Sequence, residues 1–176
     1  MIFYKAMVNG KMSAQSLLEY LKKHSWYGIT DKKDGFNWLE MISPSINSFF
    51  TQSEIDISEK KNSNQGYILC IDSLVLKFER LLREFSRKIG AQTIEIKEGG
   101  TQERISFDKL LENPKLAEII PKDDIALFTF IFTPVHMNVR NNIAHSFYKT
   151  EHYTAGLMFL LIAAFLKLGN HTFPSA

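Results

Sequence analysis

Three side chains that can handle a phosphate lie close together near the C-terminal end of the sequence, where Arg140, Asn141 and His145 form the pattern Arg-Asn-x-x-x-His. Asn141 and His145 stand at positions i and i+4, so on a helix their side chains share one face. Arginine binds a phosphate through two parallel hydrogen bonds, and histidine transfers protons near neutral pH. The pattern therefore favours a phosphate ligand, and these side chains could supply the groups needed for cleavage of an RNA backbone without a metal ion. In that reaction Arg140 stabilises charge in the transition state, and Asn141 orients the imidazole or the scissile group.

This chemistry needs one group that activates a 2′-hydroxyl and another that protonates the leaving oxygen, and one histidine cannot easily do both. A twofold dimer that brings two motif helices together would place two histidines and two arginines in one cleft. We therefore expect a homodimer with a composite site. Its expected substrate is single-stranded or looped RNA, because unpaired RNA exposes its sugar edge and its bases.

Five residues outside this trio are candidates for binding the substrate. Glu79 and Arg83 belong to a long helical pattern that would face the motif. Asn142 lies within the motif, and Tyr148 and Lys149 follow it closely, where they suit a stacked base and a phosphate. Substitution of Tyr148 or Lys149 should weaken binding more than turnover.

An ordinary structural explanation stays open for these residues. Glu79 and Arg83 also stand at positions i and i+4, where such a pair is most often a weak ion pair on a helix surface. Arg140 and His145 could likewise satisfy backbone groups or a neighbouring carboxylate at the start of a helix that Asn138 caps.

The chain is mildly basic, with a formal net charge of +2 and a pI near 8.6. This is well short of the dense positive stripe that is typical of a nonspecific duplex-DNA binder. Basic side chains from several segments could nevertheless converge on one anionic ligand. They are Lys22, Lys23, Arg80, Arg83, Arg87, Lys88, Arg140 and Lys149.

Neither a metal nor a cofactor is indicated. His136, His145 and His152 have no carboxylate or thiolate at a spacing that would complete a metal site. The sequence also lacks a Gly-rich phosphate loop, a nucleophile elbow and a Rossmann fingerprint. We therefore expect the protein to work with its own side chains alone.

The sequence favours a cytoplasmic protein without membrane contact. Cys70 is the only cysteine, so it cannot form an internal disulfide, and a reducing compartment suits it. The N-terminus lacks the pattern of a signal peptide, and the longest apolar run, 157–166, is about half of what a membrane span needs. The weakly patterned opening, residues 1–13, suggests that the sequence is cut from a longer polypeptide.

Apolar periodicity predicts most of the elements. Helices are expected over 13–23, 36–50, 68–89, 114–120, 123–132, 139–145 and 150–168. Pro44 predicts a kink or break in the second helix, and residues 123–132 have almost no polar face, which predicts burial on all sides. A β-hairpin is expected over 94–107. Residues 51–66 are polar and predict a flexible connection, while residues 1–13 show no strong element.

Together these elements predict a mainly all-α protein, a helical bundle with a small β-hairpin insertion. We expect a single domain over residues 1–176, which is an ordinary size for one hydrophobic core. Residues 1–60 would form an N-terminal helical part, and residues 61–176 would form the bundle core that holds the motif.

The motif and its surroundings resemble the HEPN superfamily, whose hallmark has the form Arg-x-x-x-x-His. The likeness covers roughly residues 65–168: a long helix, a hairpin, a buried helix, the motif and a last apolar helix. It implies that Arg140, Asn141 and His145 take the catalytic positions of a dimeric, metal-independent ribonuclease. One departure concerns the turn after the motif, where Ser146 and Phe147 stand in place of the glycine that is frequent in the family.

Two other roles remain open for a chain with this resemblance. It could be a noncatalytic HEPN module that binds RNA or dimerises a larger protein. It could also be the toxin of a toxin–antitoxin or defence system, kept silent by a regulatory protein partner. Growth arrest on expression that His145→Ala abolishes would distinguish the toxin from the other two.

Overall fold

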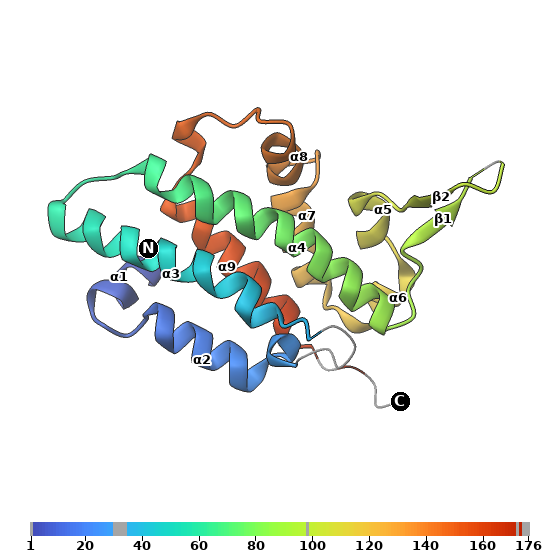
Figure 1. The fold of residues 1–176 in the computed structure, drawn as a ribbon, viewed down its shortest axis with the longest axis horizontal. Coiled ribbons are helices and arrows are strands. Elements are labelled where there is room, and N and C mark those ends of the chain that lie inside the picture. The colour runs from blue at the N-terminus through green and yellow to red at the C-terminus, as the bar shows by residue number, and fades with distance from the viewer. Residues whose placement is uncertain (1, 30–34, 98, 172, 174–176) are drawn as a thin grey trace.

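The computed structural model describes residues 2–29, 35–97, 99–171 and 173. It confirms the predicted class, because the chain is mainly helical and carries one two-stranded antiparallel sheet. The helices are α1 (Ile2–Val8), α2 (Ala14–His24), α3 (Trp38–Glu59), α4 (Ile68–Lys88), α5 (Phe107–Leu111), α6 (Pro114–Ile119), α7 (Lys122–Phe132), α8 (Val139–Ala144) and α9 (Ala155–Gly169). The strands are β1 (Ile94–Ile96) and β2 (Gln102–Arg104). In Figure 1, α2, α3, α4 and α9 form the body of the bundle, and the hairpin extends away from it.

The N-terminal part begins with an element that the sequence did not reveal. Residues 1–13 were expected to hold no strong element, and that prediction is wrong, since α1 occupies most of them. Met7 packs against the core, so a tertiary contact stabilises a helix that the spacing of apolar residues does not predict. The next helix agrees with its prediction: the Ser13 hydroxyl caps α2 by accepting a hydrogen bond from the Ser16 amide, and the Ser16 hydroxyl accepts one from the Ser13 amide.

Helix α3 is longer than predicted. It continues past Pro44 without a break and extends to Glu59, so the expected flexible connection is wrong for residues 51–59. Proline removes one backbone donor, yet burial of the apolar face, which includes Phe49 and Phe50, outweighs that loss. Beyond residue 50 the buried face is partly polar, because Ser53 and Asp56 point inward, and apolar periodicity cannot detect such a face.

The buried carboxylate of Asp56 organises the end of α3. It accepts hydrogen bonds from the Tyr67 hydroxyl at 2.7 Å, from the Ser63 amide at 3.0 Å and from the Gln52 side chain at 2.8 Å. Burial of the group acts to raise its pKa, but these hydrogen bonds together hold the pKa below its usual value. The turn between α3 and α4 is therefore bound tightly to the helix that precedes it.

Aromatic packing fills the centre of the bundle. The ring of Phe78 on α4 stacks on Phe132 of α7, with 4.4 Å between centroids, and meets the edges of Phe128 and Phe165. The N-terminal part joins this core directly, because the buried Tyr27 hydroxyl donates to the carbonyl of Phe165 in α9 at 2.6 Å. Buried residues from α2 to α9 thus form one hydrophobic core.

Helix α7 is only partly as predicted. Phe128, Ile131 and Phe132 are buried, but Phe130 is 43% exposed, so burial on all sides is wrong. The ring of Phe130 lies against His136 in the loop that leads to α8, at 5.2 Å between centroids. Within the described residues, no helix is both long and apolar enough to cross a membrane.

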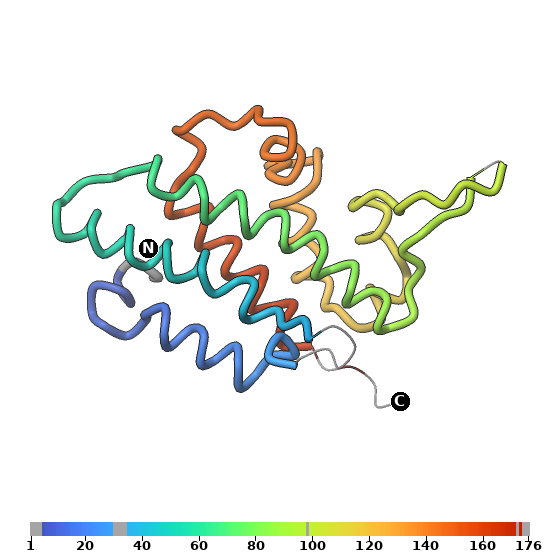
Figure 2. The backbone as a smooth tube through the Cα atoms, viewed as in Figure 1, coloured from blue at the N-terminus to red at the C-terminus, as the bar shows by residue number. Residues whose placement is uncertain are grey.

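The hairpin and the helices after it sit at one end of α4. Strands β1 and β2 pair Ile94 with Arg104 and Ile96 with Gln102, which confirms the predicted hairpin. The chain then turns directly into α5, where Ser106 accepts a hydrogen bond from the Lys109 amide. Figure 2 shows the tube leave α4, run out along the hairpin and return toward the bundle at α5. This path places the hairpin beside the C-terminal half of α4.

Candidate functional site

Helix α8, which carries most of the motif, is short, and its buried side chains attach it to the core. Val139 and Ile143 are buried, and they anchor the helix against the core. Asn138 occupies the cap position in a left-handed conformation with φ 49°, but its side chain makes no capping bond. The expectation that the Asn138 side chain caps the helix is therefore wrong, because the left-handed backbone turns it away from the first amides.

The turn after the motif forms even though Ser146 stands where the resemblance leads one to expect glycine. The Ser146 amide donates to the carbonyl of Ile143 at 3.0 Å, and the Phe147 amide donates to the carbonyl of Asn142 at 2.7 Å. These two bonds form a Schellman motif, in which the residue after the cap normally takes the left-handed conformation. Ser146 adopts it with φ 57°. Serine thus makes here the turn that glycine makes more easily, and α8 ends at Ala144 with His145 as its C-cap residue.

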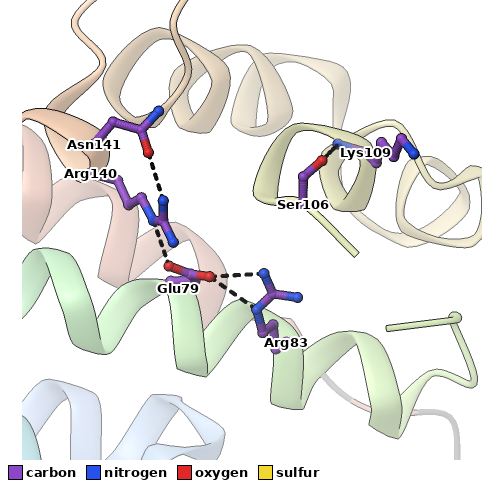
Figure 3. Close-up of polar contacts among 6 residues, drawn as sticks. All are labelled: Glu79, Arg83, Ser106, Lys109, Arg140 and Asn141. Carbon is purple, nitrogen blue, oxygen red and sulfur yellow. Dashed lines mark hydrogen bonds and ion pairs between the residues drawn. The ribbon is translucent and has the colours of Figure 1, made fainter. Parts of the chain in front are cut away.

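Glu79 joins the motif to the facing helix. Its Oε2 accepts a hydrogen bond from Nε of Arg140 at 2.8 Å, while its Oε1 accepts from Nε and Nη2 of Arg83 at 3.2 and 2.8 Å (Figure 3). The other end of the Arg140 guanidinium donates from Nη1 to the Asn141 side chain at 2.6 Å. The four predicted residues Glu79, Arg83, Arg140 and Asn141 therefore form one cluster between α4 and α8.

In this cluster, one carboxylate is bound by two arginine side chains. The side chains of Glu79, Arg83 and Arg140 are 17%, 13% and 34% exposed. Burial acts to raise the pKa of Glu79, but the hydrogen bonds and charges of Arg140 and Arg83 outweigh it, so that the pKa lies below its usual value. Two guanidinium groups share one carboxylate, and the cluster keeps a net positive charge that suits an anion. Glu79 and Arg83 are thus more than a weak surface pair.

His145 lies at the other end of α8 and is exposed. Its ring stacks on Phe147 at 5.6 Å between centroids. Among the described residues, none of the hydrogen bonds joins its imidazole to Arg140 or Asn141. The i, i+4 relation with Asn141 is present as the backbone bond from the His145 amide to the Asn141 carbonyl, at 3.0 Å. An exposed imidazole can exchange protons with a ligand that approaches from solvent.

The remaining predicted residues gather around the loop before α8. The Asn142 side chain and the Tyr148 hydroxyl both donate to the carbonyl of Met137, at 3.2 and 3.3 Å. The Tyr148 ring also stacks on His152, with 4.9 Å between centroids. Burial raises the pKa of Tyr148. Asn142 and Tyr148 therefore support the loop. The side chain of Lys149 is exposed and belongs neither to this loop nor to the cluster around Glu79.

Arginines from three elements line an open groove beside the cluster. The groove has a volume of about 680 Å³, and a neighbouring hollow of about 320 Å³ shares part of its lining. Both are lined by Glu79, Arg83, Arg104 and Arg140. Arg80 and Arg87 add to the larger one. Of the basic residues expected to converge, Arg80, Arg83, Arg87 and Arg140 do so, whereas Lys22, Lys23, Lys88 and Lys149 do not line it.

Arg104 is the one arginine of this groove that sequence reasoning missed. It lies on β2, where it pairs with Ile94 across the hairpin. The only signal for it in the sequence was its position on a hairpin directly after the long basic helix. Its place opposite α4 depends on how the hairpin folds back.

Among the described residues, no group of three or more histidine, cysteine, aspartate or glutamate side chains could hold a metal ion. The arrangement offers instead guanidinium donors, one exposed imidazole and an amide, which are groups that bind phosphate and move protons.

No protein-family model, curated protein or solved structure matches this chain.

Proposed function

We propose that this protein is a metal-independent endoribonuclease of the HEPN type, which cleaves single-stranded or looped RNA at a site formed by Arg140, Asn141 and His145. The observation that carries the proposal is the position of Arg140. Its guanidinium is fixed by Glu79 and Asn141 in the wall of a groove lined with arginines, and the exposed His145 caps the C-terminus of the same short helix. Such a guanidinium is prepared to receive a phosphate.

The proposed reaction is a transesterification within the RNA. A base removes the proton of a 2′-hydroxyl, whose oxygen attacks the neighbouring phosphorus, and the bond to the 5′-oxygen breaks as an acid protonates that oxygen. The products are a 2′,3′-cyclic phosphate and a free 5′-hydroxyl. Arg140 would stabilise the charge that develops on the phosphorus oxygens, and His145 would transfer a proton.

A second copy of the chain would supply the second histidine. One imidazole cannot easily accept the 2′-hydroxyl proton and donate to the 5′-oxygen in one concerted step, so the proposal includes a homodimer with the α8 ends of both copies at a shared cleft. The exposed rings of His145 and Phe147 provide a surface for that contact. The solution mass would then be about twice the 20.3 kDa of one chain.

Cleavage of a labelled RNA in the presence of EDTA tests the chemistry. His145→Ala should slow cleavage by roughly 10²–10⁴-fold, the contribution typical of a general acid or base. Arg140→Ala should also abolish most of the activity, whereas His136→Ala, which removes another exposed histidine, should leave it unchanged. A 2′-deoxy substitution at the cleaved nucleotide should block the reaction. Equal cleavage by wild type, Arg140→Ala and His145→Ala would refute the proposed site.

A noncatalytic role is the second candidate. It is favoured by the full engagement of Glu79 with two arginines, which is also what a structural tie between α4 and α8 looks like. In that case wild type, Arg140→Ala and His145→Ala would all bind RNA and none would cut it.

A further inference from the structure

The arginine groove continues away from the motif. Arg80, Arg83 and Arg87 follow one another on one face of α4, so their side chains are spread over on the order of 10 Å along the helix axis. Arg140 stands at one end of the row through its contact with Glu79. The hairpin forms the opposite wall, where Ile94 and Arg104 line the same groove. This is an elongated basic channel and not a point site.

Three of its arginines carry positive charge that the protein does not neutralise. Arg80, Arg87 and Arg104 are exposed, and within the described residues no ion pair involves any of them. Of the carboxylates nearby, Glu84 accepts a hydrogen bond from the Trp38 indole, and Asp108 lines the neighbouring hollow that Arg104 shares. Unpaired, clustered arginines repel one another, so a bound polyanion lowers the free energy of this face.

Arg80 is also held in place by stacking. Its guanidinium carbon lies 4.5 Å from the centroid of the Phe36 ring and 5.6 Å from that of Trp38. A cation–π contact uses the face of the guanidinium and leaves the N–H donors in its plane available for phosphate. Arg83 also has an unused hydrogen-bond donor: its Nη1 is buried and has no hydrogen-bond partner among the described residues.

We infer that this channel binds the single RNA strand that flanks the cleaved linkage, with its phosphates on Arg80, Arg87 and Arg104. The inference rests on the proposed function and names the path of its substrate. The lining alternates arginines with Leu76, Thr93 and Ile94, which offer apolar contact to sugars and bases. A strand bound here leads from the motif toward the hairpin, so a substrate needs an unpaired extension on one side of the cut.

Binding in the His145→Ala background tests the channel without interference from cleavage. The test variant is Arg87→Gln/Arg104→Gln, which removes two exposed charges, and the matched control is Lys22→Gln/Lys23→Gln on α2. Figure 1 shows α2 and the hairpin at opposite sides of the molecule. Both doubles remove the same charge from exposed side chains, so an unchanged thermal midpoint should show that each remains folded.

The readout is the affinity for a labelled single-stranded RNA as a function of salt concentration. Each lost phosphate contact to a single strand lowers the slope of log K against log salt by roughly 0.7, so the channel variant should lose about 1.4 and the control nothing. Affinity at low salt should fall at least tenfold in the channel variant. An equal slope in both doubles overturns the inference.

Two comparisons separate this inference from the proposed function. If the channel variant loses affinity while His145→Ala still cuts like wild type, the channel stands and the assigned catalysis fails. If cleavage requires His145 but the slope is unchanged, the catalysis stands and the channel fails. Tighter binding of an acidic peptide or of single-stranded DNA than of RNA through Arg87 and Arg104 would overturn the assignment of RNA as the ligand.

Discussion

Glu79 is the residue that connects the two halves of the candidate site. Its carboxylate holds Arg140 of the motif and Arg83 of α4 at hydrogen-bond distance, in a region that is largely buried. Because both of its oxygens are bound to arginines, we expect its role in the proposed site to be the positioning of Arg140. The cost of placing a carboxylate here is offset only while both arginines remain in contact with it.

Glu79→Gln should therefore lower the free energy of unfolding at neutral pH by about 2 kcal/mol, because its three charge-assisted hydrogen bonds to Arg83 and Arg140 weaken. In the wild type this stabilisation is complete above the ordinary carboxyl pKa of 4.5 and is lost as the pH falls through the lower pKa of the folded state. The variant lacks that pH dependence. Urea unfolding at pH 7 and at several values below 4.5 measures both effects.

The matched control for this prediction is Glu118→Gln, which removes an exposed carboxylate from α6. It should change stability by less than about 0.5 kcal/mol. If both variants show the same acid dependence as wild type, Glu79 is not held by its arginines in solution.

Ser146 stores a small amount of backbone strain next to the motif. A residue with a side chain costs roughly 1–2 kcal/mol in the left-handed conformation, and glycine avoids this cost. Ser146→Gly should raise the free energy of unfolding by about 1 kcal/mol. Ser48→Gly, at an exposed position in the interior of α3, should lower it by roughly 0.5–1 kcal/mol. Chemical denaturation of both variants compares them, and equal signs would show that Ser146 is unstrained.

At the scale of elements, the end of α3 depends on a buried polar contact. Tyr67 is almost fully buried, and burial together with its bond to Asp56 raises its pKa to about 12. The hydroxyl donates to Asp56, which also binds the Ser63 amide. This small network closes the turn from α3 into α4 and fixes where α4 begins.

Tyr67→Phe should destabilise the protein by roughly 1–3 kcal/mol, because the Asp56 carboxylate loses a charge-assisted partner in a buried position. Amide hydrogen exchange should rise over residues 51–66 in particular. Tyr20→Phe is the control: its hydroxyl is on a partly exposed ring and makes one long bond of 3.4 Å, so its loss should cost less than about 0.5 kcal/mol. Equal effects of the two changes would contradict this account.

Helix α4 serves the core on one face and the groove on the other. Its buried face packs Phe78, Leu82 and Phe85 into the bundle, while Arg80 and Arg87 line the groove. A single amphipathic helix thus couples the stability of the core to the placement of the arginines. Helix α8 depends on α4 in turn, since Glu79 is the partner of Arg140.

At the scale of the whole molecule, the proposed composite site requires two chains. Mixing wild type with increasing amounts of His145→Ala and allowing the chains to exchange should reduce activity per wild-type chain, because mixed dimers contain one histidine in place of two. With His136→Ala in place of the inactive partner, the activity per total chain should stay constant, because every dimer is then active. An activity that is strictly proportional to the wild-type concentration in the mixture with His145→Ala would mean that each chain works alone.

Local sequence determined most of the helices in this protein. The three- and four-residue spacing of apolar side chains marked α2, α4 and α9, and Glu98-Gly99-Gly100 between two short strands marked the hairpin, because these patterns depend on neighbours along the chain. The motif on α8 could be read for the same reason. Where a helix buries polar side chains, as α3 does with Ser53 and Asp56, the same method failed.

Only the tertiary structure decided what the motif contacts. Arg140 and Glu79 are 61 positions apart, and their bond exists because α8 and α4 pack together on one core. Arg104 reaches the groove because the hairpin returns beside α4, which no local pattern records. Contacts of this kind depend on the relative placement of whole elements. The sequence alone therefore identified the residues with suitable chemistry, and packing determined which of them share a site.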